Sequence, residues 1–277
     1  DYRDIQTLKE KNYFFKMSKY QQALIDHIGS NKNFIRPEHR KNEILGFLRQ
    51  PLSDLCISRP KSRMSWGIDL PFDNDYVTYV WFDALINYIT AVGYGIDEKS
   101  FDKWWPANMH LIGKDILTTH AVYWPTMLMS AGIDLPQTIF AHGWWLMGDS
   151  KMSKSLGNVI NPMDLIEDYG VDPVRYYLMR EMVLGQDANF TMESFIKRYN
   201  ADLANDLGNL LSRVTNLIVK NFDGKVPNYG EFSSQESGMI KTANELSNII
   251  SQKIDDMKIH DAVEETFQFV RSINRYL

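Results

Sequence analysis

The chain has 277 residues, which is enough for one large domain or two ordinary ones. Its 44% hydrophobic and 23% charged residues lie close to the globular average, so a predominantly disordered chain is excluded. A net charge of -5 means that a nucleic acid would have to be bound through local basic patches.

Two further features limit the class of protein. The single cysteine, Cys56, excludes an intrachain disulfide and a multi-cysteine zinc site within these residues. No uninterrupted run of about 18 apolar residues occurs, so a membrane partner is not expected. A cytoplasmic protein is therefore the expectation.

The first 93 residues predict helices and strands in mixed order. Apolar residues recur every four positions before Gly29, a plausible helix end, and Pro37 can begin a second helix. A turn signal at 73–75 precedes a β-branched and aromatic run, after which apolar residues return at helical spacing. The expected elements are helices over 20–28 and 37–48, strands over 54–58 and 77–82, and a helix from Ala84 until Gly93.

The segment up to residue 141 repeats the order of strand and helix. Residues 109–112 predict a strand that runs into Gly113, and a helix kinked at Pro125 follows until residues 131–132. Residues 138–141 predict the next strand. Strands that alternate with helices indicate an α/β fold, a doubly wound Rossmann-type parallel sheet with binding residues at the carboxyl ends of its strands.

Beyond residue 160 the strand signals vanish and helices are expected. Their ranges are 161–169, 172–182, a longer helix from Thr191 or Glu193, then 234–257 and 261–277, with a loop at 224–230. The long helix carries an apolar stripe of roughly six turns: Ile196, Tyr199, Leu203, Leu207, Leu210, Val214 and Leu217. The stripe should pack against the later helices, so an α-helical bundle is expected to follow the α/β part.

Residues 151–155 read Lys-Met-Ser-Lys-Ser, and they place two ammonium groups and two hydroxyls in one short loop. A solvated connection would also explain a pair of lysines in a turn. Ammonium groups can stabilise the negative charge that grows on phosphoryl oxygens during group transfer. The loop therefore favours chemistry at a phosphate.

Several separated motifs, in chain order, resemble the class I aminoacyl-tRNA synthetases and more narrowly the methionyl-tRNA synthetase family. They are Cys56-Ile57-Ser58-Arg59-Pro60, Ser65-Trp66-Gly67-Ile68, the segments 79–85, 110–117 and 142–145, and the loop 151–158. The similarity runs through essentially the whole chain. It implies an enzyme that uses ATP and Mg²⁺ to convert methionine into methionyl-adenylate, and that then esterifies tRNA(Met).

The resemblance implies which residues bind ATP and which assist catalysis. The implied catalytic residues are Lys154 and Lys151, and the implied ATP-binding residues are Gly113, Asp115, Trp145, Ser153, Lys154 and Ser155. Gly113 would let the backbone approach the adenosine, Asp115 would accept hydrogen bonds from the ribose, and Trp145 would offer backbone contacts to the adenine. Without the resemblance, Gly113 and Asp115 would be explained by a strand-to-helix turn.

A methionine pocket needs apolar and aromatic walls, because a thioether packs well against ring edges. Residues at helical spacing between 81 and 88, and Ile116, His120 and Trp124 on the following helix, could converge in this way. Such stripes usually form core instead. The resemblance implies that methionine is bound by Trp81, Ala84, Leu85, Tyr88, Ile116 and His120. Some family members carry proline at the position of Leu85, which leaves the pocket shape open there.

The helical bundle carries the expected tRNA contacts. Asn209 and Arg213 lie four residues apart on the polar face of the long helix, together with Asp202, Asp206, Asn216 and Lys220. Such a face is ordinarily only solvated. The resemblance implies that Asn209 and Arg213 hydrogen-bond splayed anticodon bases. An aromatic residue that completes this site in the family is expected beyond Leu277.

The resemblance also implies that other parts of the enzyme lie outside this chain. The His-Ile-Gly-His signature of class I synthetases is expected ahead of Asp1, since Asp26-His27-Ile28-Gly29-Ser30 lacks the second histidine and follows a helical pattern. The missing N-terminal half of the catalytic domain is thus an expected partner, and the zinc-binding insertion of many members is absent. The chain alone is expected to be inactive.

The expected organisation has three segments. Residues 1–141 would be the second half of the catalytic Rossmann domain, 142–195 the Lys-Met-Ser-Lys-Ser loop and stem-contact region, and 196–277 a truncated anticodon-binding bundle. Two alternatives stay open: a catalytically incomplete tRNA-binding fragment, and a class I synthetase for another apolar amino acid.

Overall fold

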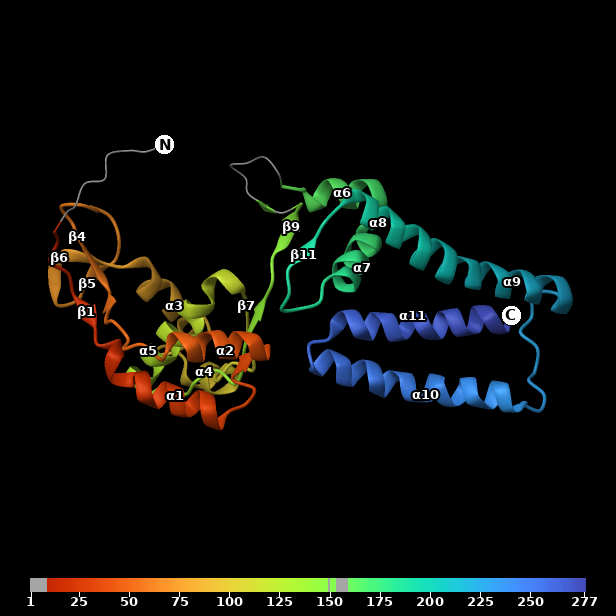
Figure 1. The fold of residues 1–277 in the computed structure, drawn as a ribbon, viewed down its shortest axis with the longest axis horizontal. Helices are drawn as coiled ribbons and strands as arrows, with labels where there is room; N and C mark the ends of the chain where they lie inside the picture. The colour runs from red at the N-terminus through yellow and green to blue at the C-terminus, as the bar shows by residue number, and fades with distance from the viewer. Residues whose placement is uncertain (1–8, 149, 153–158) are drawn as a thin grey trace. The chain divides into compact units, whose positions relative to one another are not determined.

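A computed structural model describes residues 9–148, 150–152 and 159–277 (Figure 1). The chain divides into two compact units, Asp1–His142 and Gly143–Leu277. The first contains a parallel sheet with helices around it, and the second begins with a small sheet and continues in helices. The predicted succession of an α/β part and a helical part is confirmed.

The first unit contains short strands and mostly short helices. Its strands are β1 (Phe14–Phe15), β2 (Ile35–Arg36), β3 (Leu55–Cys56), β4 (Ser58–Pro60), β5 (Asp69–Leu70), β6 (Asp73–Thr78), β7 (His110–Gly113) and β8 (Ile139–His142). Its α-helices are α1 (Gln21–Ser30), α2 (Glu38–Phe47), α3 (Val80–Thr90), α4 (Glu98–Trp104) and α5 (Trp124–Ala131). Shorter helical segments are the 3-10 turns η1 (Met17–Tyr20) and η2 (Lys114–Ile116) and the π-helical segment η3 (Thr119–Tyr123).

The parallel sheet has the strand order β2-β8-β7. Ile139 of β8 pairs with Ile35 on one side and with His110 on the other. Ile139, Phe140 and Ala141 are all buried, as expected for a parallel strand that is covered on both faces. The strands predicted at 109–112 and 138–141 are confirmed, whereas β2 was not predicted, because two residues are too few to show a periodicity.

The main apolar core of this unit joins α1, α2 and η3 to the sheet. It contains Leu24 and Ile28 of α1, Ile44 of α2, and Ile112, Ala121 and Ile139. The predicted helices over 20–28 and 37–48 are thus confirmed, with one correction at Gly29. α1 continues through Gly29 to Ser30, and Asn31 ends it by donating from its backbone N–H and side-chain amide to the carbonyl of His27.

The strand predicted over 77–82 was wrong in its position. β6 spans Asp73–Thr78 and pairs antiparallel with both β4 and β5, so the supposed turn at 73–75 lies within the strand. α3 begins at Val80, directly after the extended Tyr79. Aromatic residues at 81 and 82 suit a strand or a helix, and the positions of the pairing partners set the boundary. The strand predicted over 54–58 is divided into β3 and β4, which pair with β1 and β6.

The helix predicted after β7 is present as one helical run that changes type along its length. η2 and the π-helical η3 precede α5, and Pro125 is the second residue of α5. Gly132 ends α5 in the left-handed region, at φ 69°. The end predicted at residues 131–132 is confirmed.

In the part of the second unit that the structure describes, three short strands and a series of helices are present. The strands are β9 (Trp145–Met147), β10 (Ser150–Lys151) and β11 (Ala188–Asn189). The helices are α6 (Pro162–Tyr169), α7 (Val171–Glu181), α8 (Met192–Arg198), the π-helical η5 (Tyr199–Gly208), α9 (Asn209–Phe222), α10 (Ser234–Asp255) and α11 (Ile259–Tyr276). β11 contradicts the expectation that no strand follows residue 160: it pairs parallel with β9, and its two residues carry no recognisable pattern.

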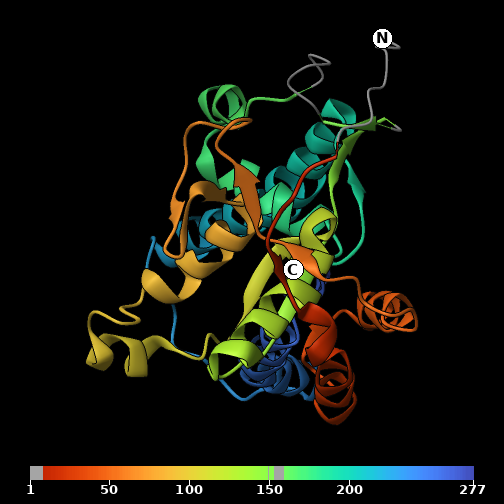
Figure 2. The same ribbon diagram turned by 90° about the vertical axis from the view of Figure 1, so that its left-hand side faces the viewer.

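The helix boundaries in this unit follow the sequence closely. Asn161 accepts a hydrogen bond from the N–H of Met163 at the start of α6, and Thr191 caps α8 through the N–H of Ser194. α8, η5 and α9 form one continuous helical run. α10 and α11 lie side by side, as Figure 1 shows from the side and Figure 2 nearly end-on.

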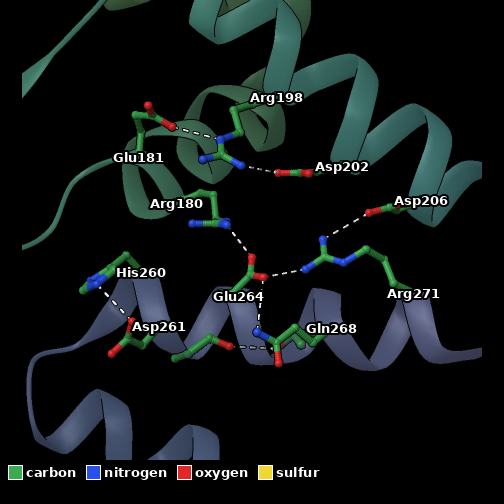
Figure 3. Close-up of polar contacts among 12 residues, drawn as sticks. Arg180, Glu181, Arg198, Asp202, Asp206, His260, Asp261, Glu264, Gln268 and Arg271 are labelled. Atoms are coloured by element: carbon green, nitrogen blue, oxygen red, sulfur yellow. Dashed lines mark hydrogen bonds and ion pairs between the residues drawn. The ribbon is translucent and has the colours of Figure 1, made fainter.

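The packing of the long helical run differs from the prediction. Ile196, Leu207 and Leu217 of the apolar stripe are 41%, 46% and 43% exposed, whereas Asp202, expected on the solvated face, is only 5% exposed. The π-helical η5 explains the difference, since its wider turns rotate the residues that follow away from α-helical spacing. The face that η5 turns toward α7 and α11 is therefore partly ionic (Figure 3).

Candidate active site

The strongest cluster of polar and aromatic side chains in the first unit joins α3 to η3. The hydroxyl of Tyr88 lies 2.8 Å from Nε2 of His120, and Nδ1 of His120 lies 2.9 Å from the carbonyl oxygen of Ile116. A carbonyl can only accept, so Nδ1 carries the proton and the tyrosine hydroxyl donates to Nε2. Both nitrogens of His120 are thus engaged.

A second histidine, His110 of β7, lies against the same rings. Its ring centroid is 4.3 Å from that of Tyr88, and its Nε2 accepts a hydrogen bond from the indole N–H of Trp124 at 3.3 Å. Burial, together with the neighbouring His120, lowers the pKa of His110 to about 4. Burial also lowers the pKa of His120, partly opposed by the Ile116 carbonyl. Both imidazoles are therefore neutral near pH 7.

Four of the six predicted methionine-binding residues lie on α3. Trp81, Ala84 and Tyr88 are half-buried, while Leu85 is 1% exposed and packs in the apolar core with Trp124 and its neighbours. The structure thus brings Tyr88 together with His120, and His120 with Ile116. Leu85 has the position of a core residue, as aromatic and apolar stripes commonly do.

Gly113 and Asp115 lie at the carboxyl end of β7, as predicted. A Cβ on Gly113 would come within 2.6 Å of a carboxylate oxygen of Asp115, so a side chain at this position would displace the Asp115 carboxylate. Asp115 itself is exposed within η2. This is the strand end at which a doubly wound sheet places its ligands.

A cleft of about 470 Å³ gathers three of the sequence motifs that the resemblance singled out. Its lining includes Arg59 of the first motif, Trp66 and Gly67 of the second, and Tyr79 of the third. The guanidinium of Arg59 lies over the Tyr79 ring, 4.4 Å from its centroid, and donates to the carbonyl of Ser58. The motifs are separate in sequence, and the pairing of β6 with β4 and β5 brings them to one place.

In the second unit, Trp145 begins β9 and lies between two strands. Backbone N–H groups of Ala188 and Phe190 donate to the carbonyls of Trp144 and Leu146. Because backbone groups alternate along a strand, those of Trp145 point to the opposite edge, on the side of β10. The Trp145 ring packs against Tyr177 and Phe190.

The predicted phosphate-binding loop begins in the described part of the chain and continues outside it. Lys151 lies in β10 opposite Leu146, but its side chain is outside the described residues, as are Ser153, Lys154 and Ser155. β9 and β10 form an antiparallel hairpin, and Lys151 is the last residue of β10.

The two predicted tRNA contacts, Asn209 and Arg213, are exposed in the first turns of α9. Arg213 donates to the backbone carbonyl of Asn274 at 2.9 Å. Their supposed neighbours differ from the prediction: Asp202 accepts from the hydroxyl of Tyr176 at 2.7 Å, and Asp206 pairs with Arg271. Those two carboxylates face the inside of the unit.

Sequence reasoning gave no role to His110 or Asn274. His110 and Ile112 alternate along β7, which signals a common face, but the partner Trp124 lies 14 residues further on. No pattern signals Asn274.

Within the described ranges, no three His, Cys, Asp or Glu side chains gather as a metal site, and none of the helices described is long and apolar enough to cross a membrane.

Comparisons with known proteins agree with the motifs. The family described as "tRNA synthetases class I (M)" matches residues 3–215. The methionine–tRNA ligases of Oceanobacillus iheyensis and Clostridium acetobutylicum are 48% and 47% identical over 99% of this chain, which covers 41% and 43% of them. The chain thus spans less than half of their length.

A solved structure gives the same result. The Mycobacterium tuberculosis methionyl-tRNA synthetase bound by methionyl-adenylate is 45% identical, with a TM-score of 0.90 over 96% of this chain and 52% of that one. The free-state structure of the Mycobacterium protein matches with a TM-score of 0.87. On these grounds the chain belongs to the methionyl group of the class I tRNA synthetases.

Proposed function

We propose that this chain forms the second half of the catalytic domain, and part of the anticodon-binding bundle, of an enzyme that charges tRNA(Met) with methionine. The observation that carries the proposal is the match to the Mycobacterium tuberculosis enzyme bound by methionyl-adenylate, at 45% identity. The substrates are methionine, the Mg²⁺ complex of ATP and tRNA(Met), and the setting is the cytoplasm. Residues 1–141 belong to the catalytic domain, residues 142–195 contain the Lys-Met-Ser-Lys-Ser loop and the stem-contact region, and residues 196–277 bind the anticodon.

The methionine side chain binds beside Tyr88 and His120. Both rings are uncharged near pH 7, and both nitrogens of His120 already have partners, so the site presents polarizable ring edges rather than a charge to the thioether. Trp81, Ala84 and Ile116 supply further half-buried apolar surface. Leu85 contributes by packing α3 against the apolar core.

ATP contacts are assigned to Gly113 and Asp115, at the carboxyl end of β7, and to Trp145, at the start of β9. Gly113 allows the ribose and adenine to approach the backbone, and Asp115 offers an exposed carboxylate to the ribose hydroxyls. The backbone of Trp145, the first residue of β9, is assigned the contacts to the adenine. Lys151, at the end of β10, and Ser153, Lys154 and Ser155, further along the chain, are assigned the contacts to the phosphates.

The two lysines act when the methionine carboxylate attacks the α-phosphate. An oxygen of the methionine carboxylate forms a bond to the α-phosphorus, and the bond from this phosphorus to the pyrophosphate oxygen breaks. Negative charge develops on the phosphoryl and pyrophosphate oxygens, and the ammonium groups stabilise this charge. Contacts made mainly in the transition state raise turnover without tightening substrate binding. Lys154 is assigned the larger effect and Lys151 the smaller.

The test is ATP–pyrophosphate exchange. Because the chain spans less than half of its curated relatives, it is assayed alone and joined to the segment that precedes the matched region in the Clostridium acetobutylicum relative. Exchange is expected with methionine in the joined protein and not in the chain alone. Lys154→Ala should lower the exchange rate about a hundredfold while methionine affinity changes little, and Lys225→Ala, in the exposed loop after α9, should change neither.

The alternatives give different results in the same assay. Faster exchange with leucine, isoleucine or valine would assign the site to another apolar amino acid. Binding of tRNA(Met) with no exchange in the joined protein would assign the chain to a non-catalytic tRNA-binding fragment. Equal exchange by the Lys154→Ala protein would remove the catalytic role given to the loop.

A further inference from the structure

Asn274, in the last turn of α11, links three helical segments of the second unit. Its side-chain amide donates to the backbone carbonyl of Asp206, in η5, at 2.7 Å. Its own backbone carbonyl accepts from the guanidinium of Arg213, in α9, at 2.9 Å. Asn274 is half-buried, whereas Arg213 is exposed.

The carbonyl that Asn274 binds lies at the junction between η5 and α9. The backbone N–H of Asn209, the first residue of α9, is shared between the carbonyls of Ala204 and Asp206. The Asp206 carbonyl has two lone pairs and so accepts from Asn209 and from Asn274 together. The change from π-helical to α-helical turns at this point sets the direction in which Asn209 and Arg213 project. Asn274 therefore bonds to the turn that sets their orientation.

The position of Arg213 has its own physical cause. The last four carbonyls of an α-helix lack donors within the helix, and this end carries partial negative charge. The carbonyl of Asn274 is one of these groups, so it attracts the positively charged guanidinium. An arginine that is already held in one orientation loses less conformational freedom when a ligand binds.

Asp206 is held a second time from the same face of α11. Arg271, three residues before Asn274, donates to the Asp206 carboxylate at 3.2 Å and to Glu264 at 2.5 Å. Glu264 also accepts from Arg180 of α7 (Figure 3). The junction residue is thus bound through its side chain by Arg271 and through its backbone by Asn274.

We infer that Asn274 is a positioning residue for the recognition of tRNA bases. It holds Asn209 and Arg213 in one arrangement before the RNA binds, and it acts through them rather than by touching a base. The inference rests on the proposed function, in which Asn209 and Arg213 contact the anticodon.

The test measures binding of two tRNA transcripts that share one body, one with the methionine anticodon CAU and one with a changed anticodon base. Asn274→Ala removes the amide that binds Asp206, together with the longer contact of 3.5 Å between the side-chain oxygen of Asn274 and Arg213. It retains the backbone carbonyl that accepts from Arg213 at 2.9 Å. The variant should bind the CAU transcript about fivefold more weakly, the size expected for one lost hydrogen bond, and should bind the changed transcript as the wild type does. Asn244→Ala, an exposed asparagine of α10, should alter neither affinity.

The same substitution in a protein that already lacks Asn209 and Arg213 separates a positioning role of Asn274 from a purely structural one. In the Asn209→Ala/Arg213→Ala protein, Asn274→Ala should cause no further loss, because the groups that it positions are absent. A loss that persists in this background, or an equal loss for both transcripts, would overturn the inference in favour of a structural role.

The failure of the proposed function looks different. If the wild-type chain binds both transcripts equally, the anticodon role fails and this inference fails with it. If Asn209→Ala/Arg213→Ala loses the preference for CAU while Asn274→Ala keeps it in full, only the positioning role of Asn274 is overturned.

Discussion

Tyr88 donates a hydrogen bond of 2.8 Å to Nε2 of His120, and this contact joins α3 to η3 at the candidate methionine site. The carbonyl of Ile116 holds the other nitrogen of His120, so the imidazole has one tautomer and one orientation. His110 and Trp124 pack against the same tyrosine. The site is therefore built from rings whose polar atoms are already bound to each other.

Removing the Tyr88 hydroxyl should cost stability. Tyr88→Phe keeps the ring but leaves the buried Nε2 of His120 without its donor, so the free energy of unfolding should fall by about 1–2 kcal/mol. Urea unfolding followed by tryptophan fluorescence measures the change. Tyr94→Phe, at a tyrosine that is 39% exposed, should stay within about 0.5 kcal/mol of the wild type. Equal effects of the two substitutions would contradict the role given to the Tyr88–His120 contact.

The stability of the first unit should fall as the solution is acidified. Burial and the nearby His120 lower the pKa of His110 from 6.5 to about 4, so the unfolded chain binds this proton more tightly than the folded one. The stabilisation is fully present above about pH 6.5 and is lost between about 6.5 and 4, by at most about 1.4 kcal/mol per pH unit for one proton.

Urea unfolding across this pH range measures the effect. In His110→Gln the amide oxygen can still accept from Trp124 but does not titrate, so the dependence on pH should weaken by about one proton. Parallel pH profiles of the variant and the wild type would show that His110 does not carry this dependence.

Removing Glu264, the carboxylate that two arginines of the second unit share, should lower the free energy of unfolding more than removing an exposed carboxylate does. Glu264 accepts from Arg180 and Arg271, whose side chains are only 15% and 31% exposed. Glu264→Ala leaves two guanidinium groups without this partner and should lower the free energy of unfolding by about 2–3 kcal/mol.

The matched control is Glu245→Ala. Glu245 pairs with Lys241 at 3.9 Å, and the two side chains are 59% and 76% exposed. This substitution should change the free energy of unfolding by no more than about 0.5 kcal/mol. Circular dichroism during urea unfolding compares the variants, and a Glu264→Ala protein as stable as Glu245→Ala would refute the prediction.

Gly143 should not tolerate a side chain. A Cβ at this position would lie 2.0 Å from the backbone oxygen of Gln186 and 2.6 Å from the backbone nitrogen of Asp187. No rotation of a side chain relieves a clash with backbone, so Gly143→Ala should force β9 and β11 apart at a cost of about 3 kcal/mol. Gly230→Ala, where nothing lies within 4 Å of the added Cβ, should be nearly neutral in thermal unfolding. A melting temperature for Gly143→Ala equal to that of Gly230→Ala would contradict the expected clash.

Part of the candidate site could be predicted from spacing and part could not. Helical periodicity places Tyr88 on α3, and the strand before Gly113 places Gly113 and Asp115 at a sheet edge. Tyr88 and His120 are 32 residues apart, and no local pattern reports that they form a hydrogen bond. The assignment of Leu85 illustrates the same limit, because a pocket stripe and a core stripe have the same period, and only its burial at 1% exposure places it in the core.

The sequence by itself determined the succession of an α/β part and a helical part, most helix ends and the motifs that identify the family. These depend on local chemistry, such as the caps Asn161 and Thr191 and the left-handed Gly132. The tertiary structure decided the position of β6, the existence of β2 and β11, and the burial of Asp202 within η5. Strand pairing, and the partners of a buried charge, come from segments distant in the chain, and a π-helical segment changes which residues share a face. The local periodicity of the sequence therefore predicts neither the long-range partners nor the π-helical segment.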